Sequence, residues 1–127
     1  MKVMVFAKAT QNTEDGTPPD PEAIQAMHDF NEALIAAGIL KDQILGGLLP
    51  TQFAKRVHFS GKNRTVIDGP FTETKEIVAG FWLWDVKSIE EAVEWVKKCP
   101  NPMFTDSDID IRPLFTEEDV AAWANLK

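Results

Sequence analysis

The sequence contains one cysteine, Cys99, and no long hydrophobic run. A single cysteine excludes both an internal disulfide and a zinc site built from several cysteines. No apolar run approaches the ~20 residues of a membrane-spanning helix, and the run at residues 3–7 is shorter than a signal-peptide core. We therefore expect a cytoplasmic protein with no membrane partner, and the motif content predicts neither a metal site nor a cofactor.

Basic side chains are also few. The 127 residues include 13 lysines and arginines against 20 aspartates and glutamates, which gives a net charge of −7. This balance argues against a nucleic-acid partner, because the phosphate backbone requires a basic surface. The length predicts a single domain over residues 1–127, in which residues 115–127 form a C-terminal tail helix.

Apolar residues follow two kinds of spacing along the chain. The segments with the pattern of β-strands are residues 3–7, 43–50, 79–86 and 108–112. A polar loop, residues 11–21, precedes a helix that begins at Asp20 and Pro21. A second helix is capped by Ser88 and ends at Cys99. The predicted core faces of these helices are Ile24, Met27, Phe30, Leu34 and Ala37 in the first, and Ile89, Ala92, Val93 and Val96 in the second.

Two more strand-like segments, residues 54–60 and 64–68, flank Gly61-Lys62-Asn63 and predict an inserted β-hairpin. The element order is then βαββαβ with an insertion, which is the ferredoxin-like α+β plan. On one predicted strand Trp82 and Trp84 point to one face of the sheet, while Phe81 and Leu83 point to the other. Helices cover only one face in this plan, so we expect a second copy of the chain to cover the other as a homodimer.

The motif Asp68-Gly69-Pro70-Phe71, followed by TETKE, resembles the DGPF-motif branch of the YCII-related family. The resemblance covers nearly the whole chain, including MKVMVFAKAT, FNEALIAAGIL, EEAVEWVKKCPNP and IDIRPLF. It implies a ferredoxin-like fold paired as a dimeric α+β barrel, with small molecules bound in a cleft between helix and sheet. Some members of the branch are linked to extracytoplasmic-function sigma factors, which implies a regulatory role as an alternative.

The resemblance also implies a His–Asp pair as the active site of the wider family. His28 matches the helical histidine of that pair, and we expect it at the edge of a buried helical face. Cys99 stands where the aspartate is expected, just before Pro100, so the pair is incomplete in this chain. A thiolate is disfavoured at the C-terminal end of a helix, and we interpret Cys99 as inert rather than nucleophilic.

The motif itself has two interpretations. Asp68, Gly69 and Pro70 have the composition of a turn that ends one strand and redirects the chain. A carboxylate between apolar walls would instead have a raised pKa, and Asp68 would act as general acid or base with His28 as its partner. Lys75 would pair with a nearby carboxylate or meet an anionic ligand. The candidate ligand-binding residues are Phe71, Thr72, Glu73, Lys75, Glu76 and Arg112.

Two further clusters have less specific patterns. His58 lies among Lys55, Arg56, Lys62 and Arg64, which we interpret as solvated charge on an edge strand rather than an anion site. Residues 106–117 place acidic side chains at calcium-loop spacing, but Ile111 occupies the position that requires glycine, so calcium is rejected.

The sequence therefore predicts a small-molecule enzyme or binder with acid–base chemistry in a cleft near the motif. The alternative is a non-catalytic regulatory or protein-interaction module. The discriminating feature is whether an enclosed cleft faces His28 and the motif, or whether the motif lies on an exposed surface.

Overall fold

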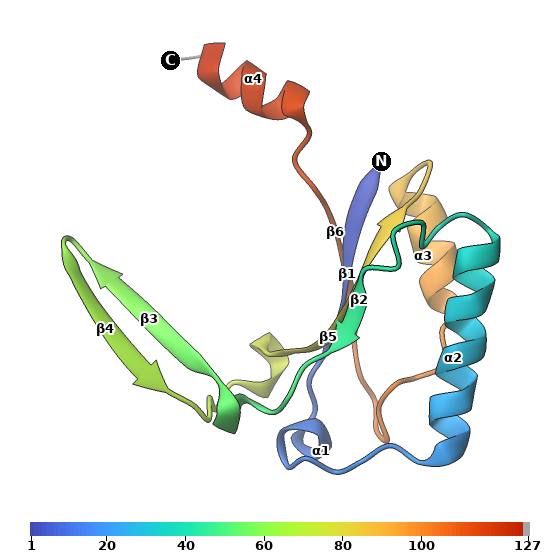
Figure 1. Ribbon diagram of the computed structural model, residues 1–127, viewed down its shortest axis with the longest axis horizontal. Coiled ribbons are helices and arrows are strands. Elements are labelled where there is room, and N and C mark those ends of the chain that lie inside the picture. Colours follow the sequence, from blue (N-terminus) through green and yellow to red (C-terminus); the bar gives the residue numbers. More distant parts are fainter. Residues whose placement is uncertain (126–127) are drawn as a thin grey trace.

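The computed structural model describes residues 1–125 as a four-stranded antiparallel sheet with two helices on one face (Figure 1). The strands are β1 (Lys2–Lys8), β2 (Leu45–Gly47), β3 (Lys55–Ser60), β4 (Asn63–Asp68), β5 (Val78–Asp85) and β6 (Ile109–Pro113). The helices are α1 (Gln11–Glu14), α2 (Pro21–Ala36), α3 (Ile89–Lys97) and α4 (Glu117–Asn125), with short 3-10 turns η1 (Thr51–Phe53) and η2 (Thr74–Glu76). Of the predicted tail helix, residues 126 and 127 lie outside the described residues.

The main sheet has the strand order β2-β5-β1-β6, and each neighbouring pair is antiparallel. This order, with α2 and α3 on one face, is consistent with the predicted ferredoxin-like fold. The register places Val3 opposite Trp84 and Val5 opposite Trp82. Because successive side chains alternate between faces, these four residues all point toward the helices.

The hydrophobic core lies between this face and the two helices. Trp84, which is 1% exposed, packs against Phe30 of α2, and the centroids of the two rings are 6.4 Å apart. Helix α2 begins as predicted, because the Asp20 side chain accepts a hydrogen bond from the Ala23 amide at 2.7 Å. The predicted core face of this helix is wrong at Ile24, which is exposed in the first turn, and at Ala37, which is exposed at the C-cap after the last turn.

Val93 was also predicted to face the core, and it is instead exposed on α3. In that helix Ala92 is fully buried, while Ile89 and Val96 are partly buried against the core. The inner face therefore contains three of the four predicted residues, and Trp95, which packs against the core, completes it in place of Val93.

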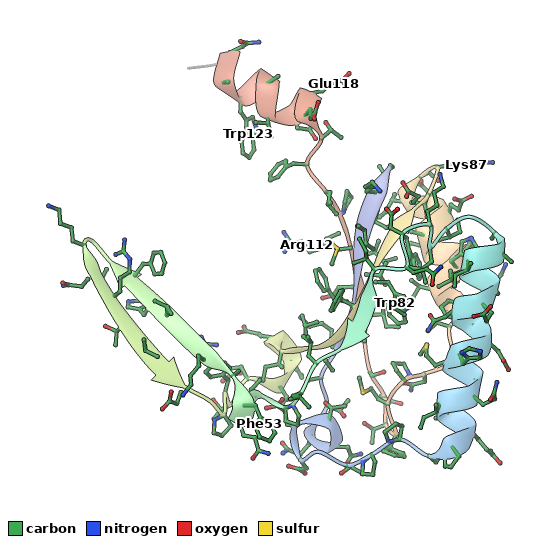
Figure 2. The ribbon with its side chains drawn as sticks, in the orientation of Figure 1. Phe53, Trp82, Lys87, Arg112, Glu118 and Trp123 are labelled. Atoms are coloured by element: carbon green, nitrogen blue, oxygen red, sulfur yellow. The ribbon has the colours of Figure 1, made fainter. Side chains whose placement is uncertain are left out.

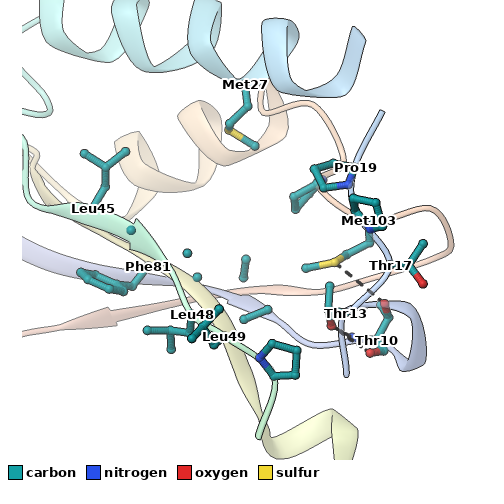
Figure 3. Close-up of a pocket in the computed structure, with 18 of the residues that line it drawn as sticks. Thr10, Thr13, Thr17, Pro19, Met27, Leu45, Leu48, Leu49, Phe81 and Met103 are labelled. Atoms are coloured by element: carbon teal, nitrogen blue, oxygen red, sulfur yellow. Dashed lines mark hydrogen bonds between the residues drawn. The ribbon is translucent and has the colours of Figure 1, made fainter. Parts of the chain in front are cut away.

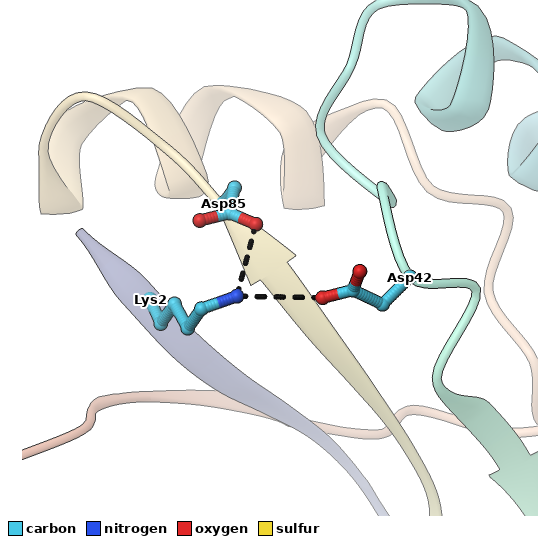
Figure 4. A network of polar contacts seen from close by, with 3 residues as sticks. All are labelled: Lys2, Asp42 and Asp85. Atoms are coloured by element: carbon cyan, nitrogen blue, oxygen red, sulfur yellow. Dashed lines mark hydrogen bonds and ion pairs between the residues drawn. The ribbon is translucent and has the colours of Figure 1, made fainter.

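The opposite face of the sheet has no helix on it. Met4, Phe6, Phe81 and Leu83 are partly exposed there, and Arg112 extends from the same face, away from Trp82 (Figure 2). One end of this face carries a small ion-pair network. Lys2 Nζ lies 3.2 Å from Asp85 and 3.5 Å from Asp42 (Figure 4), and the hydrogen bond with Asp85 is the main cause that raises the pKa of Lys2.

Two elements project from the side of the sheet that lies away from α2 and α3 (Figure 1). Strands β3 and β4 pair only with each other in a separate two-stranded sheet, and every residue of both is exposed. Helix α4 likewise buries none of its residues. None of the helices within residues 1–125 is both long enough and apolar enough to cross a membrane.

Candidate functional site

A cavity of about 520 Å³ lies between the middle of α2 and the sheet (Figure 3). Met27 and Asn31 line it from α2, and Leu45 lines it from β2. The end of the cavity away from the core is formed by residues 10–19, which contain α1, and by the loop of residues 102–104. Thr10 of the first loop approaches Met103 of the second, with 3.9 Å between the hydroxyl oxygen and the sulfur.

The cavity exists because the sheet is nearly bare of side chains at this end. Gly47 of β2 lies opposite Gly80 of β5, and Ala7 and Ala79 are also part of the wall. A β-carbon placed on Gly47 would have no heavy atom within 4 Å. Glycine in a strand often marks a place where a ligand or another chain segment approaches closely. The two strands therefore leave space that larger side chains would have filled.

None of the residues lining the cavity is ionisable. The wall is built from aliphatic, aromatic and proline side chains together with glycine. Its polar side chains are Thr10, Thr13, Thr17 and Asn31, and Trp82 also lines it. Charged residues make up 26% of the chain, yet none of them lines the cavity. A wall without charges favours uncharged ligands over ions, because an ion would lose its hydration there.

Asn31 is held in one orientation by Trp82. The Trp82 Nε1–H donates to Asn31 Oδ1 at 2.9 Å. An indole nitrogen can only donate, so the amide atom facing it must be the oxygen. The Asn31 Nδ2 group then points away from the Trp82 nitrogen. Within residues 1–125 it donates no hydrogen bond, and it is not among the buried polar atoms that lack a partner, so it is open to solvent.

The predicted acid–base residues lie outside this cavity. His28 is exposed on α2, while Met27 and Phe30 lie on the face of the helix that packs on the core. Asp68 is exposed at the end of β4, where its carboxylate lies 2.6 Å from Lys55 Nζ. The structure does not bring His28 and Asp68 together in a shared pocket. Cys99 is half-buried, and burial raises the pKa of its thiol to about 11.

The motif after β4 is tied to the chain segment that precedes the hairpin. The Gly69 amide donates to the Ala54 carbonyl at 3.0 Å, and the Gly69–Pro70 peptide bond is cis. The Phe71 amide donates to the Thr51 hydroxyl oxygen at 2.9 Å. These bonds close the base of the hairpin. They are the bonds expected if residues 68–70 form a turn that redirects the chain.

The same threonine connects the motif to α1. The Thr51 hydroxyl donates to the Glu14 carboxylate, and the Thr51 amide donates to Glu14 Oε1 at 3.1 Å. On the other side, the Arg56 guanidinium lies 3.9 Å from the centre of the Phe71 ring. Phe71 is therefore packed within the base of the hairpin, and the lining of the cavity stops at Pro50 and resumes at Ala79.

The remaining predicted ligand contacts are on the surface. Thr72, Glu73, Lys75 and Glu76 are exposed in or beside η2, and Lys75 forms no ion pair within residues 1–125. Arg112 is exposed on the open face of the sheet, opposite the helices. No group of three or more His, Cys, Asp or Glu side chains in the described part of the chain is placed to hold a metal ion.

Sequence reasoning missed Asn31 and the loop of residues 10–19. Asn31 lies four positions after Met27, so it is a polar residue on the line of a buried helical face. A polar residue at this spacing was the sequence signal that could have identified Asn31. The segment of residues 10–19 has no sequence pattern that predicts its approach to Met103, because that contact depends on tertiary structure.

Comparisons with known proteins place the chain in a family. The YCII-related domain matches residues 1–109. An uncharacterised protein of Rhizobium meliloti (strain 1021) is 37% identical over 116 residues, which cover 87% of this chain and 92% of that protein.

Among solved structures, the chain is similar to 5-chloro-2-hydroxyhydroquinone dehydrochlorinase from Burkholderia phenoliruptrix AC1100, determined in complex with 2,5-dihydroxybenzoquinone. The TM-score is 0.48 at 16% identity, and the alignment covers 94% of this chain and 99% of that chain. The domain match and the Rhizobium relative together show that this chain belongs to the YCII-related family.

Proposed function

We propose that this protein binds a small molecule in the uncharged cavity between α2 and the β2–β5 edge of the sheet. The observation that carries the proposal is the cavity itself, which measures about 520 Å³ and has no ionisable residue in its wall. Ligand sites in proteins are typically ~300–1,000 Å³, mostly apolar, with a few polar groups that set orientation. The cavity has this size and this composition.

Binding is better supported than acid–base catalysis. A general acid or base must come within hydrogen-bond reach of the group it protonates or deprotonates. Neither His28 nor Asp68 lines the cavity, so acid–base chemistry by this pair stays a prediction. Placement in the DGPF-motif branch and a regulatory role also stay proposals; the first is supported by Asp68-Gly69-Pro70-Phe71 itself.

A neutral fluorescent naphthalene, N-phenyl-1-naphthylamine, tests whether the cavity binds small molecules. We expect its emission to rise and shift to the blue on binding. The variant Gly47→Leu places a side chain into open space on the helix-facing side of β2 and should remove this signal. Glu32→Gln is the control, because Glu32 is exposed next to Asn31 and does not line the cavity.

Circular dichroism and urea unfolding would establish that the Gly47→Leu protein is folded. Equal dye binding by wild type and Gly47→Leu would contradict the proposal, since the dye would then bind to exposed apolar surface elsewhere. Absence of any dye signal in the wild type would contradict it as well.

We also propose that a second copy of the chain covers the open face of the sheet. Met4, Phe6, Phe81 and Leu83 form a partly exposed apolar surface there. The hairpin and α4 project on the same side (Figure 1), and both carry exposed large apolar residues. These residues are Val57, Phe59, Val66 and Ile67 in the hairpin and Val120 and Trp123 in α4, and Phe115 just before α4 is exposed as well.

The two projecting elements have opposite charge, which supports a copy of this chain as the partner. Strands β3 and β4 with their turn, residues 55–68, carry four basic side chains and one carboxylate. Helix α4 begins with three carboxylates and contains no basic residue. In a two-fold symmetric pair, each basic hairpin can lie near the acidic helix of the partner.

Sedimentation of two charge-introducing variants tests this assembly. Leu83→Asp places a charge on the open face and should give a monomer. Val93→Asp places the same charge on the exposed side of α3 and should leave the assembly unchanged. Added salt should weaken the wild-type dimer, because screening acts on the hairpin–helix charges. A wild-type protein that sediments as a monomer would overturn the proposal.

A further inference from the structure

We infer that the cavity selects uncharged ligands that present a hydrogen-bond acceptor, such as a carbonyl oxygen, to the side-chain amide of Asn31. This inference rests on the proposed function, and it names the class of ligand and the residue that recognises it. Three observations carry it: the composition of the cavity wall, the fixed orientation of Asn31, and the satisfaction of the nearby threonines.

The composition of the wall sets the charge of the ligand. A ligand entering the cavity exchanges water for aliphatic, aromatic and proline side chains. An ionised group would lose its hydration there without meeting an opposite charge, and that loss is not compensated. A neutral ligand with substantial apolar surface gains from the same transfer.

The amide of Asn31 supplies a directed donor. Its oxygen accepts the hydrogen bond of Trp82 Nε1 at 2.9 Å, which fixes the plane and the direction of the amide group. The Nδ2 hydrogens therefore point away from the Trp82 nitrogen, and in the described part of the chain they form no hydrogen bond with the protein. Trp82 is itself 5% exposed and held in the core against Trp84, with ring centroids 6.0 Å apart. This support keeps the donor rigid before a ligand arrives.

The other polar groups of the cavity are mostly engaged. The Thr13 hydroxyl donates to the Thr10 carbonyl at 2.8 Å and accepts from the Thr10 amide at 2.9 Å. The Thr10 hydroxyl is directed toward the Met103 sulfur. Thr17 lies in the exposed loop at the edge of the cavity. Asn31 is thus the polar side chain of the wall that lies on the long helix α2, and its amide N–H groups are not used by the protein within residues 1–125.

Three naphthalene probes separate charge from hydrogen bonding. N-phenyl-1-naphthylamine is neutral, and 8-anilino-1-naphthalenesulfonate is the same skeleton with an added anionic group. The third probe, 6-propionyl-2-dimethylaminonaphthalene, is neutral and presents one ketone oxygen. For each probe, the binding signal that is present in the wild type and absent from Gly47→Leu is assigned to the cavity. The dissociation constant of this cavity binding is the quantity compared. We expect the sulfonate to bind at least about tenfold more weakly than its neutral counterpart.

Two substitutions test the role of Asn31. Asn31→Asp keeps the size of the side chain and the oxygen that accepts from Trp82, but it replaces the donating Nδ2 group by a second oxygen. Asn31→Leu removes both polar atoms. In each variant we expect the preference for the ketone probe over N-phenyl-1-naphthylamine to fall about three- to tenfold, the equivalent of one hydrogen bond. Glu32→Gln should leave the preference unchanged.

The outcomes distinguish this inference from the proposed function. If no binding is sensitive to Gly47→Leu, the proposed function fails. If such binding is present but the sulfonate binds as tightly as the neutral dye, the charge selection is wrong. If the ketone preference is unchanged in both Asn31 variants, the donor assignment is wrong while the cavity remains a binding site. Loss of the preference in either folded variant supports it.

Discussion

The backbone of Gly69 lies so close to Thr51 that a β-carbon on Gly69 would be 1.6 Å from the Thr51 carbonyl oxygen. No side chain other than hydrogen fits in this contact without movement of the backbone. The glycine of the Asp68-Gly69-Pro70-Phe71 motif is therefore explained by packing against η1. The motif brings two parts of the chain together at the base of the hairpin, and this requires no ligand.

Gly69→Ala is expected to lower the free energy of unfolding by about 3 kcal/mol, because the added methyl group forces the motif away from Thr51. Urea unfolding followed by tryptophan fluorescence measures the change. Gly47→Ala is the control, since a β-carbon there has no neighbour within 4 Å. Similar stabilities of the two variants would show that the close contact with Thr51 is relieved at little cost.

Thr51→Val is expected to destabilise the fold by about 1–3 kcal/mol, since it removes the acceptor of the Phe71 amide and the donor to Glu14. Thr51→Ser keeps the hydroxyl and should recover most of the loss. Comparing the unfolding midpoints of the two variants isolates the hydroxyl group from the methyl group. If serine and valine destabilise equally, the methyl packing of Thr51, and not its hydrogen bonds, is what holds the motif.

Asp68→Asn tests the two interpretations of the motif. Asp68 and Lys55 form an ion pair in which both side chains are largely exposed. Solvent screening limits the value of such a pair to ~1 kcal/mol or less, so unfolding should change little. If Asp68 is an acid–base group, turnover or ligand binding will fall sharply in this stable variant. If neither changes, Asp68 is a turn residue.

The Cys99 thiol is expected to react slowly with iodoacetamide near neutral pH, because burial raises its pKa to about 11. The rate should increase roughly tenfold per pH unit until the pH approaches that value, and it should be much faster in concentrated urea. Fast alkylation of the folded protein at neutral pH would show that the thiol is accessible and activated.

The raised pKa of Cys99 also has a consequence for stability. The unfolded chain releases the thiol proton near an ordinary pKa of about 8.5, whereas the folded chain retains it. The contribution of Cys99 to stability is therefore complete below about pH 8.5 and is lost as the pH rises toward 11. A Cys99→Ala variant, which has no thiol, should show a smaller decline in stability over this pH range.

The sequence predicted those parts of the fold that depend on local patterns. Trp82 and Trp84 point to one face as alternation requires, and Asp20 caps α2 as its residue type indicates. Helix α1 was not predicted, because its residues lie in a polar stretch and its start depends on the mutual bonds of Thr10 and Thr13. Strand β2 is shorter than predicted, since only Leu45–Gly47 pairs with β5.

The candidate site was less accessible to sequence reasoning. A cleft between the first helix and the sheet was predicted, and a cavity lies there. One end of this cavity, however, is formed by residues 10–19 and 102–104, and these two segments come together only in the tertiary structure. The motif attracted attention because its polar residues are dense in the sequence, and its carboxylates are solvated. The cavity has no charged residue, so a search for titratable groups could not find it.

The closed base of the hairpin separates two parts of the chain that are neighbours in sequence. Strands β3 and β4 bond only to each other, and Thr51, Ala54, Gly69 and Phe71 join the segments before and after them. The register between β2 and β5 therefore does not depend on the number of residues between Ala54 and Gly69. A change in the length or charge of this arm would therefore alter what the arm touches and leave the geometry of the sheet and the cavity unchanged.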